Sequence, residues 1–256
     1  MQGLAGKRAL ITGGATGIGR AIALKLAREG CDIALLDIDG GTAEATAAEI
    51  RGLGRQASAV AGNVADAASV HAGVIALADA GAAIDILVNN AGIARLGSLL
   101  TISETDWRDT FAVNVDGIFN VTRAVVPGMI ERRRGAVVNL ASWLGRRGHP
   151  PFSAYAASKF AIIGMTQSLA PEVAPFGVRV NAVCPGLIAG TPMREALDRA
   201  SEDAGLTRTA ERVKAIPMGR AGTPEDVAKV AAFLASDEAA YVTGAAYDVT
   251  GGLWMT

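Results

Sequence analysis

Residues 8 to 19 have the sequence RALITGGATGIG, and this short segment gives the strongest indication of the fold. The first five residues form a short apolar run of the kind that becomes a buried strand. Glycines follow at positions 13, 17 and 19, and they let the backbone turn sharply. Residues 17–29 then form an amphipathic stretch, so the order is strand, glycine-rich turn, helix. Backbone N–H groups at such a helix start favour a bound pyrophosphate.

The same alternation continues to the end of the chain. Short apolar runs without polar alternation are typical of strands buried on both faces. We expect strands at residues 8–12, 33–37, 57–61, 84–89, 136–141, 178–183 and 246–249. We expect helices at residues 17–29, 42–53, 66–80, 103–132, 153–170 and 224–236. The sequence therefore predicts an α/β fold, a single Rossmann-type domain over residues 1–256 with a doubly wound parallel sheet of about seven strands and helices on both faces.

Composition excludes several classes of protein. Half of the 256 residues are hydrophobic and 19% are charged, which is too apolar for a disordered chain. A net charge of −1 gives no overall basic field for nucleic acid or for an anionic membrane surface. No apolar run approaches the roughly 18 residues of a membrane span, and the run after Lys7 and Arg8 is too short for a secretory signal. Cys31 and Cys184 make neither a disulfide framework nor a metal site, so we expect a soluble, cytoplasmic protein.

One segment departs from the alternation. Residues 187–220 lie between an expected strand and the last expected helix, and they are rich in glycine, proline, threonine and charged residues. Insertions of this length are usually functional lids or disordered segments, and an incidental surface excursion is the alternative. We expect a loop here that contacts the substrate.

Asp37 ends the second expected strand. An acid at this place can accept hydrogen bonds from the ribose 2′-hydroxyl of an adenosine. Its carboxylate would repel a 2′-phosphate, and the neighbouring positions, Thr16 and Ile38, supply no cation to hold one. The sequence therefore predicts NAD as the cofactor in preference to NADP. The alternative is a simple turn residue, because strand ends favour aspartate.

Tyr155 and Lys159 are four residues apart in an expected helix, so they share one face. Lowering the pKa of a tyrosine from about 10 to about 7 takes about 4 kcal/mol. An ammonium group at about 4 Å supplies about that much at an effective dielectric constant near 20. The pair could therefore act as an acid/base, although the same spacing also arises when a tyrosine packs and a lysine stays solvated.

The chain resembles the short-chain dehydrogenase/reductase family over essentially its whole length. The motifs that carry the resemblance, in the family's order and spacing, are the turn at 12–19, Asn89-Asn90-Ala91-Gly92, Asn114, Ser142, Tyr155 with Lys159, and Pro185-Gly186. The resemblance implies that Ser142 polarises the substrate oxygen and that Tyr155 exchanges its proton. It also implies that Lys159 lowers the pKa of the tyrosine and binds the nicotinamide ribose, and that Asn114 supports a water relay to the lysine.

The resemblance further implies the residues around each ligand. The residues expected to contact NAD are Gly13, Thr16, Gly17, Ile18, Gly19, Asp37, Ile38, Asn63, Val64, Asn90, Ala91, Gly92, Tyr155, Lys159, Pro185, Gly186, Ile188 and Thr191. Those expected to contact substrate are Ser142, Leu144, His149, Tyr155, Leu187 and Met193, with Trp143 and Leu197 completing the walls. Two positions depart from the family pattern: Asn63 replaces a common aspartate, and Thr191 comes one residue later than the usual threonine.

The resemblance and Asp37 together suggest an NAD-dependent oxidoreductase that converts a secondary alcohol, such as a sugar alcohol or other polyol, to a ketone. We expect a mixed pocket lining without arginines committed to a phosphate or acyl-carrier group. Two alternatives stay open: an NADPH-dependent 3-oxoacyl-(acyl-carrier-protein) reductase, and a catalytically idle NAD-binding sensor or scaffold, against which the four catalytic residues argue. The resemblance also implies a homotetramer with helices 103–132 and 153–170 at an interface.

Overall fold

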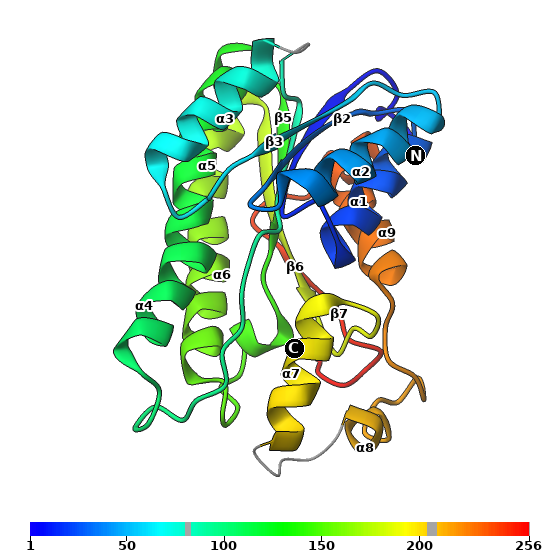
Figure 1. Ribbon diagram of the computed structural model, residues 1–256. Coiled ribbons are helices and arrows are strands. Elements are labelled where there is room, and N and C mark those ends of the chain that lie inside the picture. The colour runs from blue at the N-terminus through cyan, green and yellow to red at the C-terminus, as the bar shows by residue number, and fades with distance from the viewer. Residues whose placement is uncertain (80–82, 204–208, 256) are drawn as a thin grey trace.

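The computed structural model describes residues 1–79, 83–203 and 209–255 (Figure 1). Within these residues, one sheet consists of seven parallel strands: β1 (Arg8–Thr12), β2 (Asp32–Asp37), β3 (Ala57–Ala61), β4 (Ile86–Asn89), β5 (Gly135–Leu140), β6 (Val178–Pro185) and β7 (Ala246–Val249). Their order across the sheet is β3-β2-β1-β4-β5-β6-β7. The strand order reverses between β1 and β4, and ligands of such sheets bind beyond the carboxyl ends of the strands at that point.

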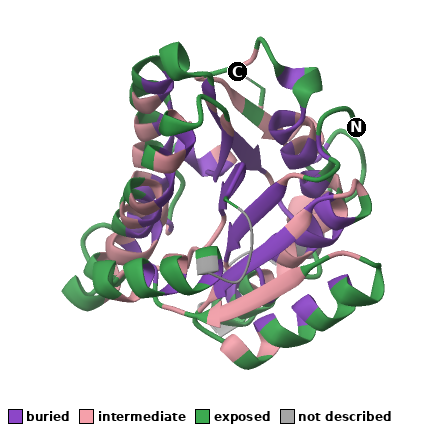
Figure 2. Ribbon diagram, turned by 90° about the horizontal axis from the view of Figure 1, so that it is seen from above, coloured by how far each residue is buried: buried purple, intermediate pink, exposed green. Residues whose placement is uncertain are grey.

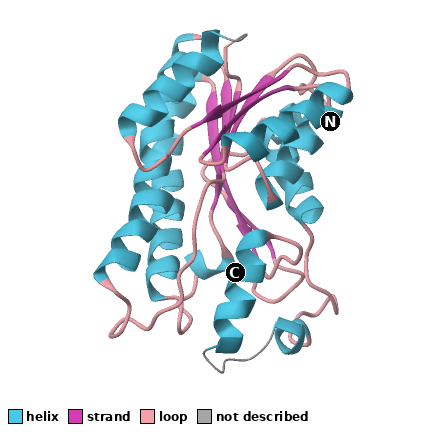
Figure 3. Cartoon of the chain, in the orientation of Figure 1, coloured by secondary structure: helices cyan, strands magenta, loops and turns pink. Residues whose placement is uncertain are grey.

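Helices cover both faces of the sheet (Figures 1 and 3). One face carries α1 (Gly17–Arg28), α2 (Gly40–Gly52) and α9 (Pro224–Ala235). The other carries α3 (Ala67–Asp79), α4 (Glu104–Phe111), α5 (Gly117–Glu131) and α6 (Ser153–Val173). Helices α7 (Pro192–Asp203) and α8 (Thr209–Val213) lie beyond the carboxyl ends of the strands. The predicted α/β fold is confirmed.

Strand β1 shows why both faces need cover. Ala9 and Ile11 belong to the core cluster under α1 and α9, while Leu10 belongs to the cluster under α3 and α5. Successive side chains of a strand point to opposite faces, so an unbroken apolar run requires a helix layer on each side. Figure 2 shows the result, with most of the sheet fully buried between the layers.

The single helix expected at residues 103–132 is wrong in one respect. A π-helical segment, η1 (Ala112–Asp116), separates α4 from α5. A π-turn accommodates one extra residue within a helix, and such turns occur often at functional sites. Asn114 lies in η1 and is fully buried. The hydrophobic pattern on either side continues across the insertion, so periodicity alone does not reveal it.

Two other segments also differ from the sequence prediction. The insertion at residues 187–220, expected as a loop, contains α7 and α8. Thr191 caps α7, since its Oγ1 accepts a hydrogen bond from the backbone N–H of Arg194 at 3.1 Å. Helix α6 continues past Pro171 to Val173. Residues 204–208 of the insertion, and Ala80 at the end of the expected helix 66–80, lie outside the described residues.

Candidate active site

The glycine-rich turn between β1 and α1 is held by an amide side chain from the neighbouring strand. Asn90 follows β4, and its Nδ2 donates hydrogen bonds to the carbonyl oxygens of Thr12 and Gly13 at 3.0 and 2.8 Å. The turn also packs closely on itself, because a Cβ at position 19 would lie only 2.0 Å from the carbonyl oxygen of Gly13. These hydrogen bonds fix the turn at the point where the strand order reverses, and the predicted contact of Asn90 with NAD is compatible with them.

Asp37 supports the same turn from β2. Its Oδ2 accepts a hydrogen bond from the backbone N–H of Ala15 at 2.9 Å, and its Oδ1 accepts one from the backbone N–H of Asp39 at 3.0 Å. The residue is partly exposed, and Ile38 beside it is 77% exposed. No described residue forms an ion pair with this carboxylate. The carboxyl edge of β2 therefore presents a negative, accessible group next to the turn.

Asn63 and Val64 follow β3 at the same edge of the sheet. The Oδ1 of Asn63 accepts a hydrogen bond from the backbone N–H of Ala65 at 3.0 Å. The carbonyl oxygen of Val64 accepts one from Asn120 Nδ2, also at 3.0 Å. These contacts fix the turn after β3 and tie it to α5.

Asn114 connects the π-helical segment to two neighbouring elements. Its Oδ1 accepts a hydrogen bond from the backbone N–H of Ile93 at 2.8 Å, and its Nδ2 donates to the Ile93 carbonyl at 2.9 Å. Nδ2 also donates to Ser158 Oγ on α6 at 2.9 Å. A Cβ at Gly92 would lie 3.1 Å from Asn114 Oδ1 and 3.6 Å from Lys159 Nζ. The absence of a side chain at position 92 thus leaves room between the amide and the ammonium.

Lys159 is buried on α6, with 4% of its surface exposed. Its Nζ donates a hydrogen bond to the carbonyl oxygen of Leu140, at the end of β5, at 2.7 Å. Nζ lies 5.5 Å from the centroid of the Tyr155 ring. Burial penalises the charged form and lowers the pKa of Lys159 to about 8. The ammonium is therefore held in a site that only partly compensates its charge.

Burial dominates the electrostatics of Tyr155, and the lowering of its pKa by Lys159 that the resemblance implies stays a prediction. Burial raises the pKa of Tyr155 above its ordinary value, and it outweighs the opposing effects of a hydrogen bond with Ser142 and of the Arg194 guanidinium. The physical reason is that the phenol lies in an apolar wall, while the ammonium of Lys159 is bonded to Leu140. The phenol is accordingly protonated at neutral pH.

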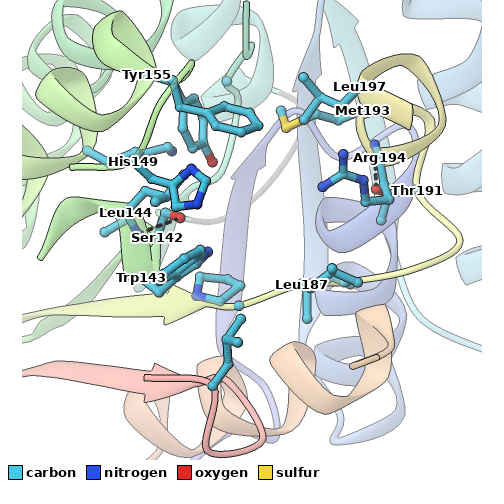
Figure 4. Close-up of a pocket in the computed structure, with 18 of the residues that line it drawn as sticks. Ser142, Trp143, Leu144, His149, Tyr155, Leu187, Thr191, Met193, Arg194 and Leu197 are labelled. Carbon is cyan, nitrogen blue, oxygen red and sulfur yellow. Dashed lines mark hydrogen bonds between the residues drawn. The ribbon is translucent and has the colours of Figure 1, made fainter. Parts of the chain in front are cut away.

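A cavity of about 460 Å³ opens beyond the carboxyl ends of the strands, with side chains from three directions turned into it (Figure 4). Of the predicted site residues, those that line it are Ile18, Asn90, Gly92, Ser142, Leu144, His149, Tyr155, Lys159, Pro185, Gly186, Leu187, Ile188, Thr191 and Met193. Trp143 and Leu197, expected as walls, also line it. Those that do not are Gly13, Thr16, Gly17, Gly19, Asp37, Ile38, Asn63, Val64, Ala91 and Asn114.

Sequence analysis missed two arginines in the cavity wall, Arg194 on α7 and Arg212 on α8. The mixed lining expected from sequence, without a cluster of arginines committed to a phosphate or acyl-carrier group, includes neither of them. The signal that could have found the first is the pair Thr191-Pro192, a cap followed by proline, which marks a helix start. In such a helix Arg194 and Leu197 lie on one face.

Two further side chains, His149 and Arg146, have aromatic and acidic neighbours respectively. His149 packs between Trp143 and Phe152, with ring centroids 6.1 and 6.3 Å away. Arg146 forms an ion pair with Asp248 at 3.2 Å. Within the described residues, no helix is long and apolar enough to cross a membrane, and no group of three or more histidine, cysteine, aspartate or glutamate side chains could hold a metal.

Comparisons with known proteins cover nearly the whole chain. A family model described as enoyl-(acyl carrier protein) reductase matches residues 13–254. The oxidoreductase UcpA of Salmonella typhimurium is 46% identical over 254 residues, covering 98% of this chain and 96% of the relative. The 3-oxoacyl-(acyl-carrier-protein) reductase FabG of Thermotoga maritima is 44% identical over 250 residues, covering 98% of each chain. A crystal structure of NAD+-bound xylitol dehydrogenase has a TM-score of 0.93 and 33% identity, covering 98% of this chain and 100% of that one.

Proposed function

The chain belongs to the short-chain dehydrogenase/reductase family, whose members are oxidoreductases acting on alcohol and keto groups. We propose that it interconverts a secondary alcohol and a ketone with NAD as its cofactor. The observation that carries the proposal is the cavity in which Ser142, Tyr155 and Lys159 meet beyond the carboxyl ends of the strands. A small polyol is the substrate class that the resemblance suggests.

The carboxyl edge of the sheet fits a nicotinamide dinucleotide. The turn at residues 13–19 brings backbone N–H groups to the start of α1, where a pyrophosphate is stabilised. Asp37 supports NAD over NADP, because its carboxylate would bond the ribose hydroxyls and repel a 2′-phosphate. Ile188 and Thr191 line the cavity, and in this proposal they contact the nicotinamide end of the cofactor. When bound, NAD+ supplies the acceptor for the hydride that leaves the carbinol carbon.

The side chains of the cavity handle the proton. Ser142 holds the substrate oxygen, and the Tyr155 hydroxyl exchanges a proton with it, losing one when a ketone is reduced and gaining one when an alcohol is oxidised. Lys159 positions the cofactor's ribose and places positive charge below the phenol. Asn114 acts as a positioning residue, since it touches Ile93 and Ser158 and does not line the cavity.

The raised pKa of Tyr155 gives the two directions different pH profiles. Reduction needs the protonated phenol, which is present at neutral pH, whereas oxidation needs the phenolate. We therefore expect the rate of ketone reduction to fall, and the rate of alcohol oxidation to rise, as pH increases through the alkaline range. Initial rates across the neutral and alkaline range with the same alcohol and ketone pair measure both profiles, and identical profiles would contradict the assignment of Tyr155.

A second candidate is a 3-oxoacyl-(acyl-carrier-protein) reductase. The relative of that name from Thermotoga maritima and the protonated phenol both favour it. Cofactor preference separates the two candidates, because such reductases usually prefer NADPH. Replacing Asp37 with Ala should raise the KM for NAD and lower that for NADP. A wild-type enzyme that prefers NADPH would overturn the choice of NAD.

A screen of polyols and other secondary alcohols, read by NADH absorbance, tests the activity itself. The matched variant is Tyr155→Phe, which removes one oxygen from the cavity. We expect turnover to fall by about 100- to 10,000-fold, the contribution of a positioned acid/base, with NADH affinity preserved. Unchanged turnover would remove Tyr155 from its role, and NADH binding without turnover on any substrate would favour an idle sensor.

We also propose a homotetramer with α4, α5 and α6 at a subunit interface. Phe119 on α5 and Phe160 on α6 support it, because 48% and 47% of these large apolar residues are exposed in the single chain. Sedimentation equilibrium should give four times the chain mass, and a monomer would contradict the proposal.

A further inference from the structure

Positively charged side chains gather in the cavity, although the net charge of the chain is close to zero. Its described lining includes Lys159, Arg194 and Arg212, and it includes no aspartate or glutamate. The net charge of the whole chain is −1. A local excess of one sign inside a concave, mostly apolar site raises the concentration of ligands of the opposite sign. The position of each arginine shows which ligand group the charge can serve.

Arg194 extends from the first turn of α7 into the cavity, opposite Ser142 and Tyr155 (Figure 4). Its side chain is 14% exposed, and Nη2 lies 2.9 Å from Asp198 Oδ1, one helical turn away. That ion pair does not complete its hydrogen bonding. Nε is inaccessible to solvent and has no hydrogen-bond acceptor among the described residues, whereas Nη2 faces the Asp198 carboxylate. Buried donors of this kind usually have a partner, so an acceptor is missing from this face of the guanidinium.

This guanidinium faces the reacting end of the cavity from the opposite wall (Figure 4). Arg194 and Tyr155 influence each other's pKa, and each lies within electrostatic reach of the other. Burial is the largest cause that lowers the pKa of Arg194, Asp198 opposes it, and the charge of Arg212, which comes from α8, adds to the lowering. Two like charges brought together with incomplete compensation are unfavourable unless an anion joins them. The arrangement resembles a binding site for an oxyanion more than a structural salt bridge.

We propose that the substrate carries a compact oxyanion, a carboxylate or a sulfonate, which Arg194 binds with Arg212 while Ser142 and Tyr155 hold its reacting oxygen. The inference rests on the proposed alcohol/ketone chemistry and narrows its substrate class from polyols in general to small hydroxy acids or their sulfonate analogues. The planar fork of an arginine matches both oxyanions, because two parallel N–H groups can bond two oxygens. The volume of about 460 Å³ limits the substrate to a small molecule.

The cofactor's own phosphates are the other anions that could meet Arg194. The glycine-rich turn at residues 13–19 offers them backbone N–H groups and the start of α1, as described above. Arg194 instead acts on the phenol of Tyr155, where the substrate's oxygen reacts. The two assignments make different predictions, since an arginine on the phosphates would control NADH affinity.

The test compares 3-hydroxybutanoate with its neutral amide, 3-hydroxybutanamide, as substrates of the NAD+-loaded enzyme, with 2-hydroxypropane-1-sulfonate to separate carboxylate from sulfonate. We expect the wild type to prefer at least one anion over the amide by about 10-fold or more in kcat/KM, because charge-assisted hydrogen bonds are worth about 10- to 100-fold in affinity. The variants are Arg194→Met and Arg194→Lys, and the matched control is Arg108→Met, an exposed arginine on α4.

For Arg194→Met we expect the KM for the preferred anion to rise about 10- to 100-fold. The loss of kcat/KM for that anion should be about ten times larger than the loss of kcat/KM for the amide. Arg194→Lys keeps the charge and should recover part of the loss, and Arg108→Met should match the wild type. Equal use of anions and amide by the wild type would overturn the proposal. So would an Arg194→Met variant that weakens NADH binding, measured by fluorescence, as much as it weakens the anion.

Calorimetry separates failure of this inference from failure of the proposed function. 3-Oxobutanoate is titrated into the NAD+-loaded protein, where no hydride is available and only binding is measured. Binding that Arg194→Met abolishes and Arg194→Lys retains supports the oxyanion site even if no alcohol is turned over. Equal affinity in the wild type and Arg194→Met overturns it, whatever the activity screen shows.

Discussion

The turn between β1 and α1 borders the cavity through Ile18, and helices α7 and α8 form part of its wall, but the two regions contribute differently. The turn acts through its backbone. The glycines at positions 13 and 19 lie so close to neighbouring backbone atoms that a side chain at either position would collide with them. The α7–α8 segment acts through side chains, with Met193, Arg194 and Arg212 reaching inward from helices. Backbone geometry suits a ligand part that never varies, and side chains on a separate segment suit a part that differs between relatives.

The largest effect is expected from a side chain added to the turn, which tests whether the turn binds the cofactor through its backbone. In Gly19→Ala the new Cβ would lie 2.0 Å from the Gly13 carbonyl oxygen, so the turn must distort. Overpacking of this kind typically costs about 1–3 kcal/mol, and if this cost falls on the cofactor-binding conformation of the turn, NADH affinity drops by about 5- to 150-fold. Fluorescence titration with NADH measures it.

The control is Gly148→Ala, at an exposed glycine beside the substrate end of the cavity. A Cβ added there would have no neighbouring atom within 4 Å, and the backbone φ of this glycine is an ordinary one. The variant should leave NADH affinity within a factor of about two, as a surface substitution does. A Gly19→Ala variant that keeps NADH affinity within the same factor of about two would mean that the turn tolerates a side chain and that the contrast between the two regions is false.

A smaller effect is expected at the π-helical segment that holds Asn114. Asn114→Ala leaves the backbone N–H and C=O of Ile93 without their side-chain partner and removes a bond to Ser158. Buried groups left unpaired cost about 1–3 kcal/mol each, so we expect the free energy of unfolding to fall by about 3 kcal/mol. Urea denaturation measures the change, and a loss below about 0.5 kcal/mol, the usual range of surface substitutions, would show that the π-helical segment does not depend on this amide.

The pH dependence of stability tests the buried lysine. The pKa of Lys159 is about 8 in the folded protein, below its ordinary value of 10.5. Between these values the unfolded chain binds a proton that the folded protein does not, so this group makes stability rise with pH, by about 2 kcal/mol from about pH 8 to about pH 10. The raised pKa values of Cys31 and Cys184 act oppositely above their ordinary value of 9.0.

The Lys159 contribution is therefore read as the difference between the wild type and Lys159→Met. Both proteins carry the same cysteines, so their effect cancels in the difference. A difference that stays constant across this pH range would show that the ammonium is not destabilised by burial.

The sequence predicts the turn between β1 and α1 better than it predicts the inward-facing side chains of α7 and α8. The strand, turn and helix at residues 8–28 follow from local patterns, and so do the strands that bury alternate side chains on both faces. Tyr155, Ser142 and Lys159 come together as the family resemblance implies. The site roles themselves stay predictions until variants are measured.

Other features depend on tertiary contacts that a local pattern does not contain. The π-helical segment at Ala112–Asp116 inserts one residue without disturbing the flanking periodicity. The raised pKa of Tyr155 comes from burial, which spacing to Lys159 does not reveal. Arg194 and Arg212 look like ordinary surface charges in the sequence, and only the placement of α7 and α8 over the cavity turns them inward.

The central claim is that one cavity brings the cofactor's nicotinamide and the substrate's oxygen to Tyr155. A crystal structure with NAD+ and a bound alcohol tests it most directly. We expect the alcohol oxygen within about 3 Å of both Tyr155 Oη and Ser142 Oγ, with the nicotinamide ring against Pro185 and Gly186. A nicotinamide bound elsewhere, or a Tyr155 hydroxyl directed away from it, would contradict the account.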